Sequence, residues 1–137
     1  MSIPLNALVV EDSADDALLL VRHLQRGGVQ VDWLRVETEE SLYKALHEKT
    51  WDIVFSDFSL PCFSGLDALW VLRESGIEIP FILVSGAMGE EIAVDVMKAG
   101  AQDYILKDNL TRLLPSVERT LREAHNRQAR EQAETQP

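Results

Sequence analysis

Short, continuous apolar runs recur along the chain, and the apolar residues between these runs are spaced three and four positions apart. The runs that predict strands are residues 7–10, 31–36, 53–55, 81–84 and 104–106. A short run without polar interruption is typical of a strand buried on both faces of a sheet. The second run differs, because Asp32 and Arg35 interrupt it. Charged side chains favour an edge position, so we expect this strand at the border of the sheet.

The stretches between the runs have the period of amphipathic helices. After the first strand, Ala17, Leu20, Val21 and Leu24 fall on one helix face. Similar patterns predict further helices with apolar positions in residues 42–46, 66–70, 93–97 and 114–124. Pro115 lacks an N–H group, so we expect it at the first position of the last helix.

Alternating strands and helices predict an α/β fold with a parallel sheet. Right-handed crossovers place helices on both faces, which gives a three-layer, doubly wound architecture of five strands. The 137 residues suit one domain. No large apolar residue follows Asn126, so we expect the domain in residues 1–125 and a polar helical tail or linker in 126–137. Trp33, Trp51 and Trp70 are interpreted as core or sheet-flank residues.

Composition narrows the classes of partner. The formal net charge is −10, and there is no basic recognition helix, so direct nucleic-acid binding is not expected. No apolar run approaches the roughly 18 residues that a membrane span requires, so membrane insertion is not expected either. Cys62 is the only cysteine, which excludes an internal disulfide. We therefore expect a cytoplasmic protein.

Polar residues that can support chemistry follow four of the five expected strands. They are Glu11, Asp12, Asp57, Ser85 and Lys107. The carboxyl ends of parallel strands share one edge, so we expect these side chains to converge. Crowded carboxylates favour a hard divalent cation, and Mg²⁺ is the most plausible one. Carboxylates, Mg²⁺, a lysine and a hydroxyl suit phosphoryl chemistry, with Asp57 as the candidate nucleophile.

This order of residues resembles the receiver domain of two-component response regulators. The similarity runs from about residue 7 to residue 121 and extends to Pro61, Gly65 and Tyr104. It implies a flavodoxin-like sheet with strand order 2-1-3-4-5. It also implies that a partner histidine kinase or phosphotransfer protein supplies a phosphoryl group to Asp57. The domain would then be a phosphoacceptor that catalyses only its own phosphorylation and dephosphorylation, not an enzyme with a separate substrate.

The same resemblance assigns roles to individual residues. Mg²⁺ would be bound by Glu11, Asp12, Asp57 and the backbone carbonyl of Ser59. The phosphoryl group would be held by Ser85 and Lys107, and Tyr104 would reorient as the readout. A downstream output domain or effector protein would read this change, and a homodimer that forms on phosphorylation is an open alternative.

Two positions depart from the family pattern. Asp108 follows Lys107 where family members usually have proline, often with a cis peptide bond. Gly86 follows Ser85 where alanine is more usual, which leaves room for water beside a phosphoryl group.

Other functions remain open from the residues alone. One is a degenerate receiver that binds proteins without being phosphorylated. Another is a Mg²⁺-dependent aspartyl phosphohydrolase, although the chain is too short for a substrate cap. A flavodoxin-like binder of a small phosphorylated molecule is disfavoured, because Glu11 and Asp12 would repel a phosphate.

Overall fold

The computed structural model describes residues 3–86 and 90–135. Its sheet has five strands, all parallel, in the order β2-β1-β3-β4-β5. The strands are β1 (Ile3–Val10), β2 (Val29–Val36), β3 (Ile53–Ser56), β4 (Phe81–Ser85) and β5 (Asp103–Leu106). This order confirms the expected topology, and β2 lies at the predicted edge.

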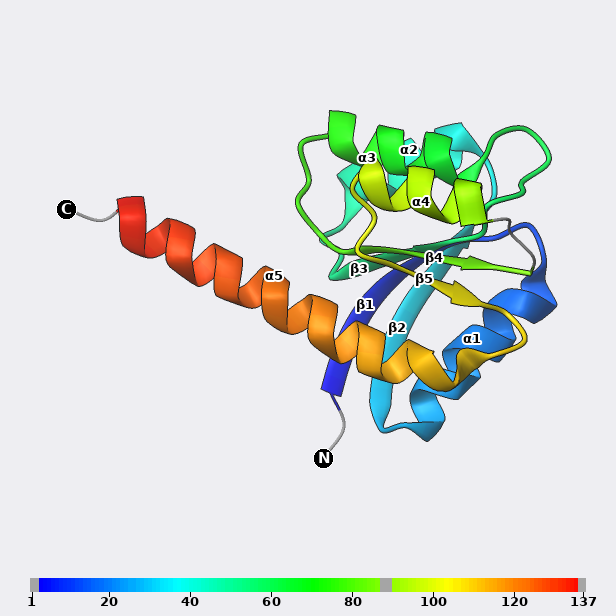
Figure 1. Cartoon of the computed structure of the whole chain (residues 1–137), viewed down its shortest axis with the longest axis horizontal. Helices are drawn as coiled ribbons and strands as arrows, with labels where there is room; N and C mark the ends of the chain where they lie inside the picture. The colour runs from blue at the N-terminus through cyan, green and yellow to red at the C-terminus, as the bar shows by residue number, and fades with distance from the viewer. Residues whose placement is uncertain (1–2, 87–89, 136–137) are drawn as a thin grey trace.

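Helices cover both faces of the sheet (Figure 1). They are α1 (Ala14–Arg26), α2 (Glu39–Glu48), α3 (Gly65–Glu74), α4 (Glu90–Lys98) and α5 (Leu113–Thr135), with a 3₁₀ turn, η1 (Leu110–Arg112), before the last. Figure 1 shows α2, α3 and α4 on one side and α1 and α5 on the other. The expected three-layer architecture is therefore confirmed. Among the described residues, no helix is long and apolar enough to span a membrane.

The two sides of the sheet form two separate apolar cores. On β1, Leu8 and Val10 pack with α2, α3 and α4, whereas Ala7 and Val9 pack with α1 and α5. This alternation follows from the two-residue period of a strand. Every residue of β3 and β4 is buried, which explains why their sequences read as uninterrupted apolar runs.

The first strand, β1, which precedes Glu11 and Asp12, is longer than the apolar run that predicted it. β1 starts at Ile3 rather than at residue 7, because its first residues pair with β2 from Val29 onward. Pro4 and Asn6 interrupt the apolar pattern in this part of β1. Pairing with an edge strand does not require an apolar side chain at each position, so the pattern alone underestimated the strand.

Pro115 is not the first residue of the last helix. It is the third residue of α5, which begins at Leu113 directly after η1. The first four N–H groups of a helix have no intrahelical partner, so proline is tolerated there as well. The predicted start was therefore two positions too late. Past Ala124 the described side chains are exposed, and α5 extends beyond the body of the domain (Figure 1); a domain boundary at residue 125 remains a prediction.

The three tryptophans have different environments. Trp51 is buried, and its indole N–H donates to the carbonyl of Ala45 at 2.8 Å. Trp33 is half-buried. Trp70 is 65% exposed on α3, so its interpretation as a core or sheet-flank residue was wrong. Leu69 and Leu72 of α3 face the core, and a residue adjacent to Leu69 in a helix is rotated about 100° away.

Gly65 allows the first turn of α3 to approach the loop after β3. A Cβ atom at this position would lie 2.6 Å from the carbonyl oxygen of Asp57 and 2.7 Å from Cδ1 of Leu83. The Gly65 N–H also donates to the carbonyl of Phe58 at 2.8 Å. Helix and loop are therefore in direct backbone contact beside Asp57, and there is no room for a side chain.

Gly65→Ala should consequently destabilise the protein by about 1–3 kcal/mol, the usual cost of overpacking. Urea unfolding would measure this loss. Gly86→Ala is the matched control, because no atom of the described residues outside its chain neighbours lies within 4 Å of a Cβ atom built there. Equal stability of the two variants would contradict this account of Gly65.

Candidate functional site

Three strand pairings fix the backbone of the expected site residues. The N–H of Glu11 donates to Val36, that of Asp57 to Val10, and that of Lys107 to Ser85, at 3.0, 2.9 and 2.8 Å. Each bond continues the sheet pairing one residue beyond the strand. The register of the sheet therefore sets which side chains meet at its carboxyl edge.

Three carboxylates gather at this edge. Glu11, Asp12 and Asp57 each offer an oxygen within 4.8 Å of the other two. Glu11 and Asp57 are buried, whereas Asp12 is exposed. An all-oxygen group that is open on one side fits a hard divalent cation that retains several waters. The predicted ligands are therefore brought together in a form that could hold Mg²⁺.

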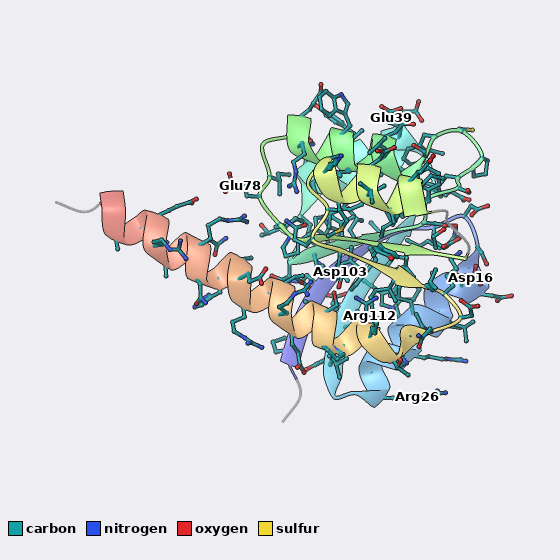
Figure 2. All side chains as sticks on the ribbon, viewed as in Figure 1. Asp16, Arg26, Glu39, Glu78, Asp103 and Arg112 are labelled. Atoms are coloured by element: carbon teal, nitrogen blue, oxygen red, sulfur yellow. The ribbon has the colours of Figure 1, made fainter. Side chains whose placement is uncertain are left out.

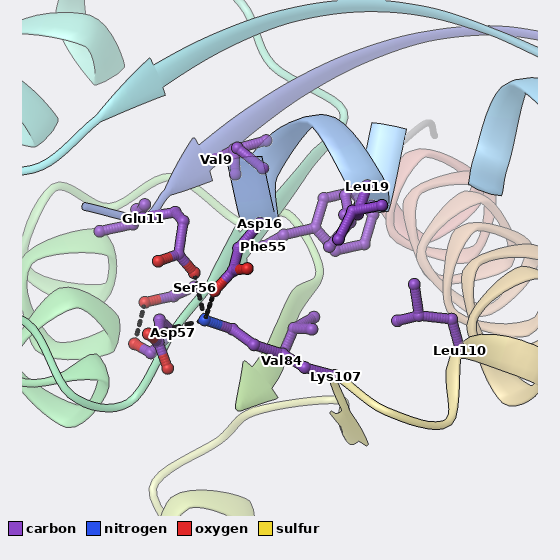
Figure 3. Close-up of a pocket in the computed structure, with 13 residues that line it drawn as sticks. Val9, Glu11, Asp16, Leu19, Phe55, Ser56, Asp57, Val84, Lys107 and Leu110 are labelled. Carbon is purple, nitrogen blue, oxygen red and sulfur yellow. Dashed lines mark hydrogen bonds and ion pairs between the residues drawn. The ribbon is translucent and has the colours of Figure 1, made fainter. Parts of the chain in front are cut away.

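The side chain of Lys107 reaches into the same group (Figure 3). Its Nζ lies within ion-pair distance of three carboxylates: Asp16 Oδ2 at 2.7 Å, Glu11 Oε2 at 2.8 Å and Asp57 Oδ2 at 3.1 Å. Burial alone lowers the pKa of Lys107, but these three hydrogen bonds outweigh it and raise the pKa above its usual value. The ammonium is therefore the internal counter-charge of the acidic group.

The pKa of Glu11 is also raised, but for a carboxyl group this disfavours the charged form. Burial raises its pKa, despite the opposing hydrogen bonds from Lys107 and the N–H of Ser13, and the nearby charge of Asp57 adds to the increase. A raised carboxyl pKa means that the ionised form is disfavoured at this position. Burial is thus the main reason that the charged form of Glu11 is disfavoured, and the neighbouring charge of Asp57 adds a smaller contribution.

Two further residues support the site and were not predicted as part of it. Asp16 binds Lys107 through its carboxylate, at 2.7 Å from Nζ. Its location one helical turn after Asp12 was the available signal. Arg35 donates to the carbonyls of Glu11 and Asp12 at 3.2 and 3.5 Å. It thereby secures the acidic loop from the edge strand.

The loop after Asp57 is closed by local bonds. The N–H of Phe58 donates to Oδ1 of Asp57 at 2.7 Å, which fixes one side of the carboxylate. Ser59 forms an isolated antiparallel bridge with Ser64, which caps α3. The expected ligand Ser59 thus lies in a constrained turn two residues beyond Asp57.

The expected switch residues lie on the two strands β4 and β5. Ser85 is buried at the end of β4 and accepts the backbone N–H of Lys107 at 2.8 Å. Tyr104 is half-buried on β5 and lines a hollow against Val94 and Met97 of α4. The described part of the chain has no cis peptide bond, so the bond between Lys107 and Asp108 is trans. Aspartate at position 108 is compatible with placing the lysine in the site.

A third buried acid, Asp103, connects β5 to α5. Asp103 accepts hydrogen bonds from the hydroxyl of Ser116 at 2.7 Å and the guanidinium of Arg119 at 3.2 Å, and Arg112 lies 3.5 Å away. Figure 2 shows Asp103 at the start of the strand beside α5. This group is at the opposite end of β5 from Lys107. It anchors the helix and is separate from the acidic site.

Together, the parallel sheet of order 2-1-3-4-5 and its acidic carboxyl edge define a flavodoxin-like α/β domain, with the acidic group at the edge where such folds usually bind ligands. Residues 7–118 match the family model of the response regulator receiver domain. The chain therefore belongs to the receiver-domain family of two-component response regulators.

Curated relatives are longer than this chain. The luminescence regulatory protein LuxO of Vibrio campbellii is 28% identical over 117 residues, which cover 85% of this chain and 25% of the relative. The virulence transcriptional regulatory protein PhoP of Salmonella choleraesuis is 35% identical over 108 residues, or 75% of this chain and 45% of the relative. The chain thus spans about a quarter to a half of these relatives.

Solved structures share the fold over nearly the whole chain. A signal receiver domain assigned to the Luxo repressor protein of Vibrio parahaemolyticus superposes with a TM-score of 0.81, at 26% identity over 93% of this chain and 97% of that one. NtrX of Brucella abortus, solved in complex with ADP, gives 0.82 at 26% identity, over 96% of this chain and 29% of that one.

Crowding of carboxylates predicts that Asp57→Asn stabilises the protein in the absence of metal. Asparagine keeps an oxygen acceptor for Lys107 and removes one negative charge. We expect a gain of roughly 1 kcal/mol, equivalent to about one pKa unit. Urea unfolding in EDTA at neutral pH measures it.

The pH dependence provides the control. Because the pKa of Glu11 is raised, the folded state binds its proton more tightly than the unfolded state does. The wild-type protein therefore gains this stability as the pH falls through the raised pKa, and loses it as the pH rises. The advantage of Asp57→Asn should shrink on mild acidification; an advantage that grows would refute the crowding argument.

Proposed function

We propose that this chain is a phosphoacceptor switch in which Asp57 accepts a phosphoryl group from a histidine of a partner kinase or phosphotransfer protein. The observation that carries the proposal is the position of the Asp57 carboxylate. It belongs to the group that could hold a metal, and its Oδ2 lies 3.1 Å from Lys107 Nζ. A nucleophile between a metal site and a fixed cation suits phosphoryl transfer, which depends on positioning and charge neutralisation.

In the proposed reaction, a carboxylate oxygen of Asp57 attacks phosphorus. The bond between phosphorus and the donor's histidine nitrogen breaks, and that nitrogen keeps the bonding electron pair. The N–H of Phe58 already holds Oδ1 of Asp57 at 2.7 Å, which orients the carboxylate. Lys107 contributes a positive charge for the phosphoryl oxygens.

Mg²⁺ is the proposed cofactor. Its expected ligands are the carboxylates of Glu11, Asp12 and Asp57 and the carbonyl of Ser59. When bound, it supplies neutralisation of the phosphoryl charge. The exposed side chain of Asp12 leaves the group accessible from solvent, which is consistent with an ion that keeps part of its water shell.

The proposed response uses Ser85 and Tyr104. The hydroxyl of Ser85 would donate to a phosphoryl oxygen, and Tyr104 would move into the space beside it. Tyr104 lines the hollow against α4, so its movement would alter the surface of α4, β5 and α5. Such a change is a population shift between two packings.

The proposed partners follow from this role. A kinase or phosphotransfer protein supplies the phosphoryl group, and an output domain or separate effector reads the altered surface. Residues 126–137 would be the linker or docking segment, and a phosphorylation-dependent homodimer remains an alternative readout. A cytoplasmic location remains a prediction, as does the absence of direct nucleic-acid contact.

The phosphoacceptor role is tested by incubating the protein with acetyl phosphate and Mg²⁺ and recording intact mass. The wild type should gain one phosphoryl group that maps to Asp57 and decays slowly, whereas Asp57→Asn should gain none. Sustained turnover of a phosphorylated substrate would favour the aspartyl phosphohydrolase instead. A wild type that never forms an adduct would favour the degenerate receiver.

The switch is tested with beryllofluoride, a phosphoryl mimic, by amide NMR. Shifts should extend from the loop after Asp57 to Tyr104 and α4. Lys107→Ala should reduce these distant shifts more than it reduces phosphorylation, because it removes the cation that links the phosphoryl group to β5. Shifts confined to the Asp57 loop would contradict the proposed switch.

A further inference from the structure

Asp16 stands apart from the other carboxylates that contact Lys107. It has the shortest contact with the ammonium, 2.7 Å, yet it does not belong to the group that could hold a metal. Figure 3 shows its side chain pointing toward Lys107 from the first turn of α1. Helix capping uses only its backbone N–H, which donates to Ser13 Oγ at 3.2 Å. The carboxylate is therefore free to bind the lysine.

The ammonium of Lys107 is fully committed in this arrangement. It has three N–H donors, and three carboxylates from separate elements lie at 2.7 to 3.1 Å. Two of these carboxylates, Glu11 and Asp57, are also the candidate metal ligands. A divalent cation bound to those two would repel the ammonium and compete with it for the same oxygens.

Lys107 needs another partner when it leaves Glu11 and Asp57. Its side chain is only 23% exposed, so water cannot fully replace a lost carboxylate. Asp16 is 38% exposed at its side chain, more than Glu11 or Asp57, and it is not one of the three candidate metal ligands. It can therefore retain the lysine while Glu11 and Asp57 bind a metal.

We propose that Asp16 is a positioning residue that holds the ammonium of Lys107 when a divalent cation takes over Glu11 and Asp57. This inference rests on the proposed function, because it assumes that the acidic group binds Mg²⁺. Asp16 thereby keeps Lys107 at the rim of the site, in reach of an incoming phosphoryl group. If Asp16 loses its charge, Lys107 can pair only with Glu11 and Asp57, and it then competes with Mg²⁺ for these ligands.

The test compares Mg²⁺ affinity by isothermal titration in wild type, Asp16→Asn and Asp15→Asn. Asp15→Asn is the matched control: it removes the same charge from the same helical turn, but Asp15 is exposed and has no ion pair with Lys107. Asp16→Asn should weaken binding about tenfold, as outer-shell partners of metal sites do. Asp15→Asn should change it by less than about twofold, as expected for a screened surface charge. Asp16→Glu, which keeps the charge, should lie closer to wild type than Asp16→Asn.

Each outcome has one interpretation. If wild type binds no Mg²⁺, the proposed function fails. If wild type binds and the two asparagine variants are equally weak, or if Asp16→Glu is as weak as Asp16→Asn, only the role of Asp16 fails. Amide spectra establish that each variant is folded before its affinity is compared.

A second measurement follows the ammonium directly. The ¹⁵Nζ signal of Lys107 should remain protected from hydrogen exchange in Mg²⁺-saturated wild type, because Asp16 still binds it. In Mg²⁺-saturated Asp16→Asn this protection should be lost, while in metal-free Asp16→Asn it should persist through Glu11 and Asp57. Equal protection in the two Mg²⁺-saturated proteins would overturn the proposal.

Discussion

Repulsion among carboxylates at one edge of the sheet is the constraint on which this domain depends. Glu11, Asp12 and Asp57 share a space in which their oxygens lie within 4.8 Å, and two of the three are buried. Lys107 is the one ammonium that pairs with this group among the described residues, and burial, which raises the pKa of Glu11, disfavours the charged carboxylate further. Lys107 lies among these carboxylates as their counter-charge, and the group could also hold a divalent cation.

The rest of the fold holds this unfavourable arrangement together. Strand register fixes the backbone of Glu11, Asp57 and Lys107, and Arg35 secures the acidic loop from β2. Gly65 permits α3 to press against the carbonyl of Asp57. Buried strands and two apolar cores supply the stability that holds this crowded polar group in place.

The fold and the main site residues were predictable because their signals are local and periodic. Buried strands read as apolar runs, and a residue that follows a parallel strand must lie at its carboxyl edge. Asp16 was missed because its role depends on a lysine 91 positions away. Arg35 was taken only as an edge-strand charge, and its contact with two carbonyls is a tertiary property. Trp70 shows the same limit, since neighbouring residues of a helix can face core and solvent.

The central claim is that a metal and Lys107 exchange places as counter-charges of Glu11 and Asp57. A crystal structure with Mn²⁺, located by its anomalous signal, tests this most directly. The account predicts an ion bound to oxygens of Glu11, Asp12 and Asp57, with Lys107 Nζ withdrawn from Glu11 and Asp57. An ion bound elsewhere, or Lys107 still paired with both residues beside a bound ion, would contradict it.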